Sequence, residues 1–174
     1  MSECSECIAQ QVENTERIPI LPPLDANGSP VMDMAHEVMW DIGRTIASHH
    51  AESGGVLGTR RGELEVTHYH YDSAGSRSRV TYAPDVPTIN ALLGGAWEHA
   101  TPSVDLLGCI HSHPPGSEFL SQPDLRYIAR LLELNSDMGV FFAPIVLPDS
   151  QRLIPWIVYR DRPWHPVRAR LRLI

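Results

Sequence analysis

Apolar residues recur every three to four positions in three stretches of the chain, a period typical of amphipathic helices. The first helix is expected to begin soon after Pro30, the second is entered through Asp85 and Pro87, and the third follows Pro123. The apolar positions that share a face in the first and third helices are Met32, Ala35, Val38, Met39, Ile42 and Ile46, and then Leu125, Ile128, Leu131 and Leu132.

Strands are expected between and after these helices. Residues 52–59 and 63–72 predict a hairpin with its turn at Thr59–Gly62, and the apolar run 105–114 predicts a buried strand. Two more strands are expected near Phe141–Leu147 and Leu153–Arg160. In the last nine residues, arginines alternate with apolar residues, which predicts a closing strand with one cationic face: Arg168, Arg170 and Arg172.

This order of elements predicts one α+β domain, with a mixed β-sheet flanked by about three helices. We expect it to span residues 31–174. Residues 1–30 are expected to form a polar, acidic, partly flexible tail, with at most a short strand at Ile18–Leu21.

Charge and composition exclude several function classes. The net charge of −7 argues against nucleic acid as a partner, because phosphate binding depends on clustered cations. Three cysteines do not make a disulfide framework, which favours a reducing compartment. No apolar run approaches the roughly 18 residues of a membrane span. The first residues carry acids where a signal peptide carries positive charge. We therefore expect a cytoplasmic protein with no membrane partner.

The chemistry is concentrated at residues 111–124. His111 and His113 are two positions apart, so on a strand both imidazoles project to the same side and can share a metal ion. Asp124 lies in the first turn of the third helix, from which it can point back to the strand end. Zinc held by three protein groups keeps a fourth position for water, as in catalytic sites. Such a water has a pKa of about 7 and supplies hydroxide at neutral pH.

Each part of this motif also has a plainer explanation. A His-x-His pair alone is weak evidence, and His68–His70 repeats the spacing without a following carboxylate at a helix start, so we interpret it as surface or packing histidines. Ser121 and Asp124 alone match an ordinary helix capping box.

The cysteines and a second histidine pair also have plain interpretations. Cys109 shares the face of the metal-binding histidines but lies one pleat, about 6.6 Å, deeper than the first of them, which favours a core thiol. Cys4 and Cys7 have zinc-knuckle spacing but no second pair, and we expect an inert tail. His49 and His50 are interpreted as polar residues at a helix end.

Taken together, His-x-His, seven residues, Ser121, two residues and Asp124 resemble the motif of the JAMM (JAB1/MPN/Mov34) metalloproteases. These are zinc isopeptidases, many of which remove ubiquitin or ubiquitin-like proteins. The likeness extends upstream, where Glu52 begins the run ESGGVLG, similar to the family's glutamate followed by a glycine-rich strand. In coarse element order the resemblance covers about Met32 to Tyr159.

The resemblance implies a single MPN/JAB-type domain and a role for each matching residue. His111, His113 and Asp124 would hold Zn²⁺. Glu52 would act as the general base that takes a proton from the zinc-bound water and returns it to the leaving lysine amine. Ser121 would hydrogen-bond the oxyanion of the tetrahedral intermediate.

The short chain further resembles prokaryotic JAB-type members, several of which accompany bacterial ubiquitin-like conjugation systems. The loop from Asp72 to Asp85 is the one candidate for gripping a modifier's C-terminal tail. We expect a deubiquitinase-like enzyme that cleaves after the tail of a ubiquitin-like modifier, during deconjugation or precursor maturation. Its partners would be the modifier, its conjugates, and operon-encoded activating and conjugating enzymes.

Two alternatives stay open: a protease that processes a sulfur-carrier protein, and a noncatalytic MPN-type scaffold. The cationic C-terminal strand would suit docking of an acidic modifier or a second subunit, although a solvated face is the commoner explanation. All fourteen cationic residues are arginine. Escape from a lysine-directed conjugating enzyme would explain this, but genomic base composition explains it more simply.

Overall fold

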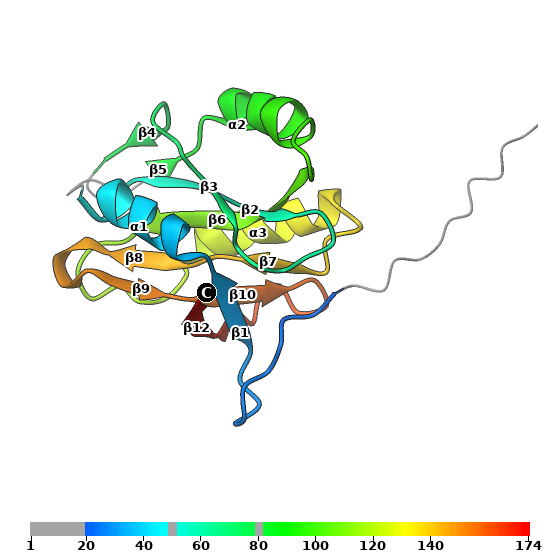
Figure 1. The fold of residues 1–174 in the computed structure, drawn as a ribbon. Helices are drawn as coiled ribbons and strands as arrows, with labels where there is room; N and C mark the ends of the chain where they lie inside the picture. The colour runs from blue at the N-terminus through cyan, green and yellow to red at the C-terminus, as the bar shows by residue number, and fades with distance from the viewer. Residues whose placement is uncertain (1–19, 49–51, 79–81) are drawn as a thin grey trace, which may run out of the picture.

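The structure is a computed structural model, which describes residues 20–48, 52–78 and 82–174. Its centre is a sheet of eight strands (Figure 1). These strands are β2 (Gly54–Arg60), β3 (His68–Tyr71), β6 (Val104–Ser112), β7 (Val140–Phe142), β8 (Ile145–Leu147), β9 (Arg152–Ile154), β10 (Trp156–Tyr159) and β11 (Val167–Arg168).

The sheet has the order β11-β10-β7-β6-β2-β3, with β8 also beside β6 and β9 beside β8. Strand β6 pairs antiparallel with β2 and parallel with β7 and β8, so the sheet is mixed. Two small sheets accompany it. One pairs β1 (Val31–Met34) with β12 (Arg170–Leu173), and the other pairs β4 (Ser76–Arg77) with β5 (Tyr82–Ala83).

Three α-helices cover the sheet (Figure 1). Helix α1 (His36–Arg44) packs with β1 against one face, in a core cluster that includes Leu57 and Ile110. The opposite face is covered by α2 (Val86–Leu92), which continues in a π-turn, and by α3 (Gln122–Leu134). The predicted α+β class, with a mixed sheet and about three helices, is confirmed.

The first helix is shorter than the sequence predicts. The periodicity places its start near residue 31, but residues 31–34 form a strand in parallel register with β12. Met32 and Met34 are fully buried there, whereas Asp33 between them pairs with Arg172 at 2.6 Å. The apolar positions of residues 31–34 are compatible with a strand as well as with the helical period. Pairing with the distant residues 170–173 makes this segment a strand. Ile46 lies beyond α1, in a short 3-10 turn.

Two predicted strands are each divided at a proline. The expected strand at 141–147 becomes β7 and β8, which flank Pro144, and the strand at 153–160 becomes β9 and β10, which flank Pro155. Proline has no N–H for the ladder, so pairing shifts there to another neighbour. As a result β6 contacts β7 at Gly108 and β8 at His111.

The expected hairpin is confirmed as β2–β3, although β3 begins only at His68. The prediction for Ile18–Leu21 falls partly outside the described residues, and Ile20 and Leu21 are not in a strand. In the part of the chain that the structure describes, no helix is both long and apolar enough to span a membrane.

Candidate metal centre

The C-terminal end of β6 presents two histidines on the sheet face covered by α2 and α3. His111 lies opposite Ile145 of β8, and the His113 main-chain N–H donates to Val146 O at 2.9 Å. Neighbouring strands therefore fix both backbones. The His113 side chain is buried, and the Nε2 atoms of the two rings are 2.7 Å apart, so both converge on one point.

Asp124 approaches the same point from the first turn of α3. Its Oδ1 lies 3.5 Å from Nε2 of His111, and its Oδ2 lies 3.5 Å from Nε2 of His113. The ligand atoms of the three residues all lie within 4.8 Å of one another. Among the described residues, this is the one cluster of three or more such side chains able to share a metal ion.

A capping box sets the direction of the Asp124 side chain. The Ser121 N–H donates to Oδ2 of Asp124 at 2.7 Å, and the Asp124 N–H donates to Oγ of Ser121 at 3.3 Å. The capping explanation left open by the sequence is thus present, and it aims the carboxylate at the histidines. Since a hydroxyl has one donor and two acceptor positions, Ser121 can still donate. Its catalytic role stays a prediction.

Electrostatics link the carboxylate to the imidazoles. Burial alone would raise the pKa of Asp124, but hydrogen bonds from His111, His113 and Ser121 outweigh it and hold that pKa far below its usual value. For His113, burial lowers the pKa, but Asp124 and the carbonyl of Ser117 outweigh it and raise the pKa. Nδ1 of His113 lies 3.0 Å from Ser117 O, so Nδ1–H donates there and Nε2 is left free to bind a metal.

Glu52 reaches the site through the register of β2 and β6. Gly54 lies opposite His111, and the Ser112 N–H donates to Ser53 O at 2.8 Å, so the antiparallel pairing continues past the end of β2. The same register places Glu52 opposite His113, and directly opposed residues point to the same face. Burial raises the pKa of the Glu52 carboxyl, while the two histidines act in the opposite direction.

An apolar cavity of about 240 Å³ opens beside this cluster, between α2 and α3. Its walls include the candidate metal ligands His111 and Asp124. The other lining residues are Gly55, Val56, Tyr82, Ala83, Pro84, Ile89, Cys109, Ile110, Pro123, Tyr127, Ile128, Phe141 and Ala143. Burial raises the pKa of the Cys109 thiol to about 12, so it stays neutral. Cys109 packs against the clusters beneath α2 and α3, as expected of a core thiol.

The loop from Asp72 to Asp85 supplies one wall of this cavity. The buried carboxylate of Asp72 accepts hydrogen bonds from the Tyr82 hydroxyl at 2.7 Å and from the main-chain N–H groups of Gly75 and Asp85, both at 2.8 Å. Tyr82, which lines the cavity, is therefore held in place by a residue outside it.

The structure describes only some of the other cysteines and histidines that the sequence singled out. Cys4, Cys7, His49 and His50 are outside the described residues. The His68 ring packs edge-on against the Trp97 ring, with the two ring centroids 6.2 Å apart, as expected for a packing histidine.

The arginines of the C-terminal strands pair with acids. Arg168 pairs with Glu118, Arg170 with Asp25 and Arg172 with Asp33. The expected cationic face is therefore largely neutralised.

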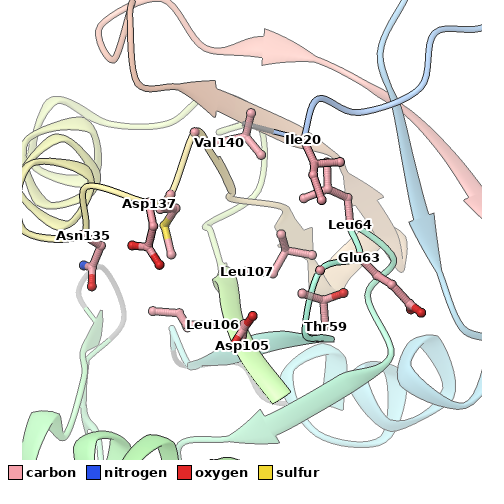
Figure 2. A pocket seen from close by; sticks show the side chains of 13 residues that line it. Ile20, Thr59, Glu63, Leu64, Asp105, Leu106, Leu107, Asn135, Asp137 and Val140 are labelled. Atoms are coloured by element: carbon pink, nitrogen blue, oxygen red, sulfur yellow. The ribbon is translucent and has the colours of Figure 1, made fainter. Parts of the chain in front are cut away.

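A larger cavity, of about 570 Å³, lies at the opposite end of β6 (Figure 2). Leu106 on its wall is five residues from His111, or about 17 Å along a strand. Glu63, Asp105 and Asp137 line it. Asp105 pairs with Arg61 at 3.0 Å and Glu63 with Arg60 at 3.8 Å, so two of these acids are already paired with arginines. This cavity is separate from the metal centre.

Comparison with known proteins agrees with this geometry. The profile of prokaryotic homologs of the JAB domain matches residues 38–165, well over half of the chain. The chain belongs to this prokaryotic JAB family. The JAMM resemblance is thereby confirmed at the level of the domain.

Solved structures are also similar to this chain. A protein from Desulfitobacterium hafniense, determined in solution, aligns with a TM-score of 0.55 and 16% identity over 82% of this chain and 92% of that one. A crystallised JAB1/MPN domain protein from Archaeoglobus fulgidus aligns with a TM-score of 0.47 and 12% identity, over 83% and 98% of the two chains. A search of curated proteins finds no match.

Proposed function

We propose that this JAB-domain protein is a zinc-dependent peptidase or isopeptidase that cleaves after the C-terminal tail of a ubiquitin-like modifier. The observation that carries the proposal is the convergence of His111, His113 and Asp124 beside an apolar cavity that His111 and Asp124 line. The β2–β6 register, continued two residues past Gly54, puts Glu52 opposite His113.

The donor set fits zinc. Two imidazole nitrogens and one carboxylate oxygen are ligands that zinc prefers, and three protein ligands leave a position for water. The hydrogen bond from Nδ1 of His113 to Ser117 O supplies the outer partner that orients a zinc-binding imidazole. Zinc bound there would lower the pKa of its water to about 7 and polarise the scissile carbonyl.

The chain's own groups would then move protons and stabilise charge. Glu52 would take a proton from the attacking water and deliver it to the leaving amine. Burial suits it to both steps, because it brings the carboxyl pKa closer to neutrality. The Ser121 hydroxyl, exposed at the start of α3, would donate a hydrogen bond to the oxyanion.

The cavity favours an extended tail as the substrate. About 240 Å³ is too small for a folded domain but suits a few residues of unfolded chain, and its walls carry almost no charge apart from the metal group. Between the Tyr82 wall and α3, such a chain would bring its last carbonyl to the histidines. This supports a modifier of a bacterial conjugation system, which ends in a flexible tail, as the partner.

The test is cleavage of a fusion between a neighbouring ubiquitin-like protein and a reporter by the zinc-loaded protein. Glu52→Gln should remove the proton acceptor with little change in shape and lower kcat by at least about 100-fold. Glu63→Gln is the matched control, since the Glu63 side chain forms an exposed pair with Arg60 at 3.8 Å and lines the separate, larger cavity.

Equal cleavage by the wild type and Glu52→Gln would refute the assigned role of Glu52. Full zinc occupancy without cleavage of any modifier fusion would favour the scaffold alternative. Cleavage of sulfur-carrier fusions alone would favour the second alternative.

A further inference from the structure

Ser112 lies between the two histidines but points to the opposite face of β6. Its side chain is buried, with 1% of its surface exposed, and it meets Ser53, which is fully buried, on the neighbouring chain segment. The Ser53 N–H donates to Oγ of Ser112 at 3.0 Å, and the Ser112 N–H donates to Ser53 O at 2.8 Å.

This pair differs from an ordinary antiparallel pair. In a hydrogen-bonded pair, the two residues exchange two bonds between main-chain groups. Here the second bond ends on a side-chain oxygen, so the hydroxyl of Ser112 completes the pair one residue beyond the start of β2 at Gly54.

The residue fixed in this way adjoins Glu52. On the other side, the Glu52 N–H donates to Ser78 O at 2.9 Å. The main chain is therefore hydrogen-bonded both at Glu52, to Ser78 O, and at the next residue, Ser53, to the hydroxyl of Ser112. Ser112 belongs to the same strand as the two histidines of the candidate metal centre.

We infer that Ser112 is a positioning residue, which aligns the Glu52 carboxylate with the metal group through the main chain of Ser53. The inference rests on the proposed hydrolytic function. Ser112 touches neither substrate nor metal, so its loss should act on the chemical step rather than on binding. A displacement of the base by about 1 Å can cost about 100-fold in rate.

The experiment compares three variants in the zinc-loaded full chain. Ser112→Ala removes the hydroxyl and leaves the buried Ser53 N–H without its acceptor. Ser112→Thr keeps the hydroxyl and adds a β-branch that a strand tolerates. Ser53→Ala is the matched control: among the described atoms its Oγ has no hydrogen-bond partner, and only its main chain takes part in the pair.

Amide hydrogen exchange at residue 53 tests the contact directly. Exchange should be faster by at least about 10-fold in Ser112→Ala and unchanged in Ser112→Thr and Ser53→Ala. Modifier cleavage should show kcat lowered by about 10- to 100-fold in Ser112→Ala, KM and zinc affinity within about 3-fold of the wild type, and recovery in Ser112→Thr. If Ser112→Ala does not fold, Ser112→Cys, with its weak acceptor, takes its place.

The outcomes separate this inference from the proposed function. The inference alone is overturned if the wild type cleaves the fusion and Ser112→Ala has the same kcat. It is also overturned if the residue 53 amide in Ser112→Ala exchanges as slowly as in the wild type. A change in KM or zinc affinity with kcat retained also overturns it. A zinc-loaded wild type that cleaves no fusion overturns both.

Discussion

Replacement of Asp72 by asparagine tests how the wall of the cavity beside the candidate metal centre is held. The carboxylate is 1% exposed and accepts hydrogen bonds at Oδ1 from Gly75 and at Oδ2 from Tyr82 and Asp85. Asparagine has almost the same shape but only one oxygen. Whichever way the amide is turned, its NH₂ group faces at least one N–H or O–H donor.

The expected loss is about 2 kcal/mol of unfolding free energy at pH 7. A hydrogen bond to a charged group contributes about 1.5–3 kcal/mol, and the neutral amide is less costly to bury, which offsets part of that loss. In a domain of this size, about 2 kcal/mol corresponds to a melting temperature lower by roughly 4–8 °C. In at least one orientation of the amide, the Tyr82 hydroxyl loses its hydrogen bond to residue 72. Since Tyr82 lines the cavity, KM for a modifier fusion should rise as well.

The loss should depend on pH. Burial alone would raise the pKa of Asp72, but hydrogen bonds from Asp85, Tyr82 and Gly75 outweigh it and lower the pKa. A carboxylate with a lowered folded pKa stabilises the protein above its unfolded pKa of about 3.9, and this contribution is lost as pH falls through the folded value. The difference between wild type and Asp72→Asn should therefore shrink below about pH 4.

Urea unfolding at pH 7 and at pH 3 measures both effects. Asp105→Asn is the control, because Asp105 forms an exposed pair with Arg61 and should cost no more than about 1 kcal/mol. A loss below about 0.5 kcal/mol at pH 7, or a loss that is the same at both pH values, would refute the reasoning.

Three further predictions concern the sheet and the metal group. Gly108→Ala should destabilise by about 1–3 kcal/mol in urea unfolding, because a Cβ there would meet the main chain of Phe142, whereas Gly94→Ala meets nothing within 4 Å and should be neutral. His113→Ala should abolish the rise in melting temperature that zinc produces, and His70→Ala should keep it. In metal-free protein, the lowered pKa of Asp124 and the raised pKa of His113 stabilise the fold between about pH 4 and 6.5, so the stability difference from Asp124→Asn should be largest in that window and fall on either side.

The elements that local signals specify were predictable from sequence. The capping residues Ser121 and Asp124 with Pro123 mark the start of α3, and the structure begins that helix at Gln122. The run into His111 predicted a buried strand, and β6 occupies it. These predictions succeed because periodicity, capping and turn residues act within a few positions of one another.

Predictions that depend on distant partners were less complete. The strand at Val31–Met34 exists because residues 170–173 lie beside it, and no local pattern separates it from a helical turn. Similarly, the acids that pair with Arg168 and Arg172 come from far along the chain. The candidate metal centre likewise depends partly on local sequence signals and partly on the pairing of distant segments. The spacing of the histidines follows from the strand period, whereas the position of Glu52 depends on how two strands align.

That alignment is nevertheless encoded, in the glycines that follow Glu52. A slip of one residue between β2 and β6 would move Glu52 to the opposite face, into the apolar cluster beneath α1. A slip of two residues would keep the face but put another residue, such as Val56, in the place of Gly54. A Cβ at Gly54 would already meet the Tyr82 ring and the carbonyl of Ile110. Only a residue without a Cβ fits this position, so the glycine fixes the register that brings the carboxylate opposite His113.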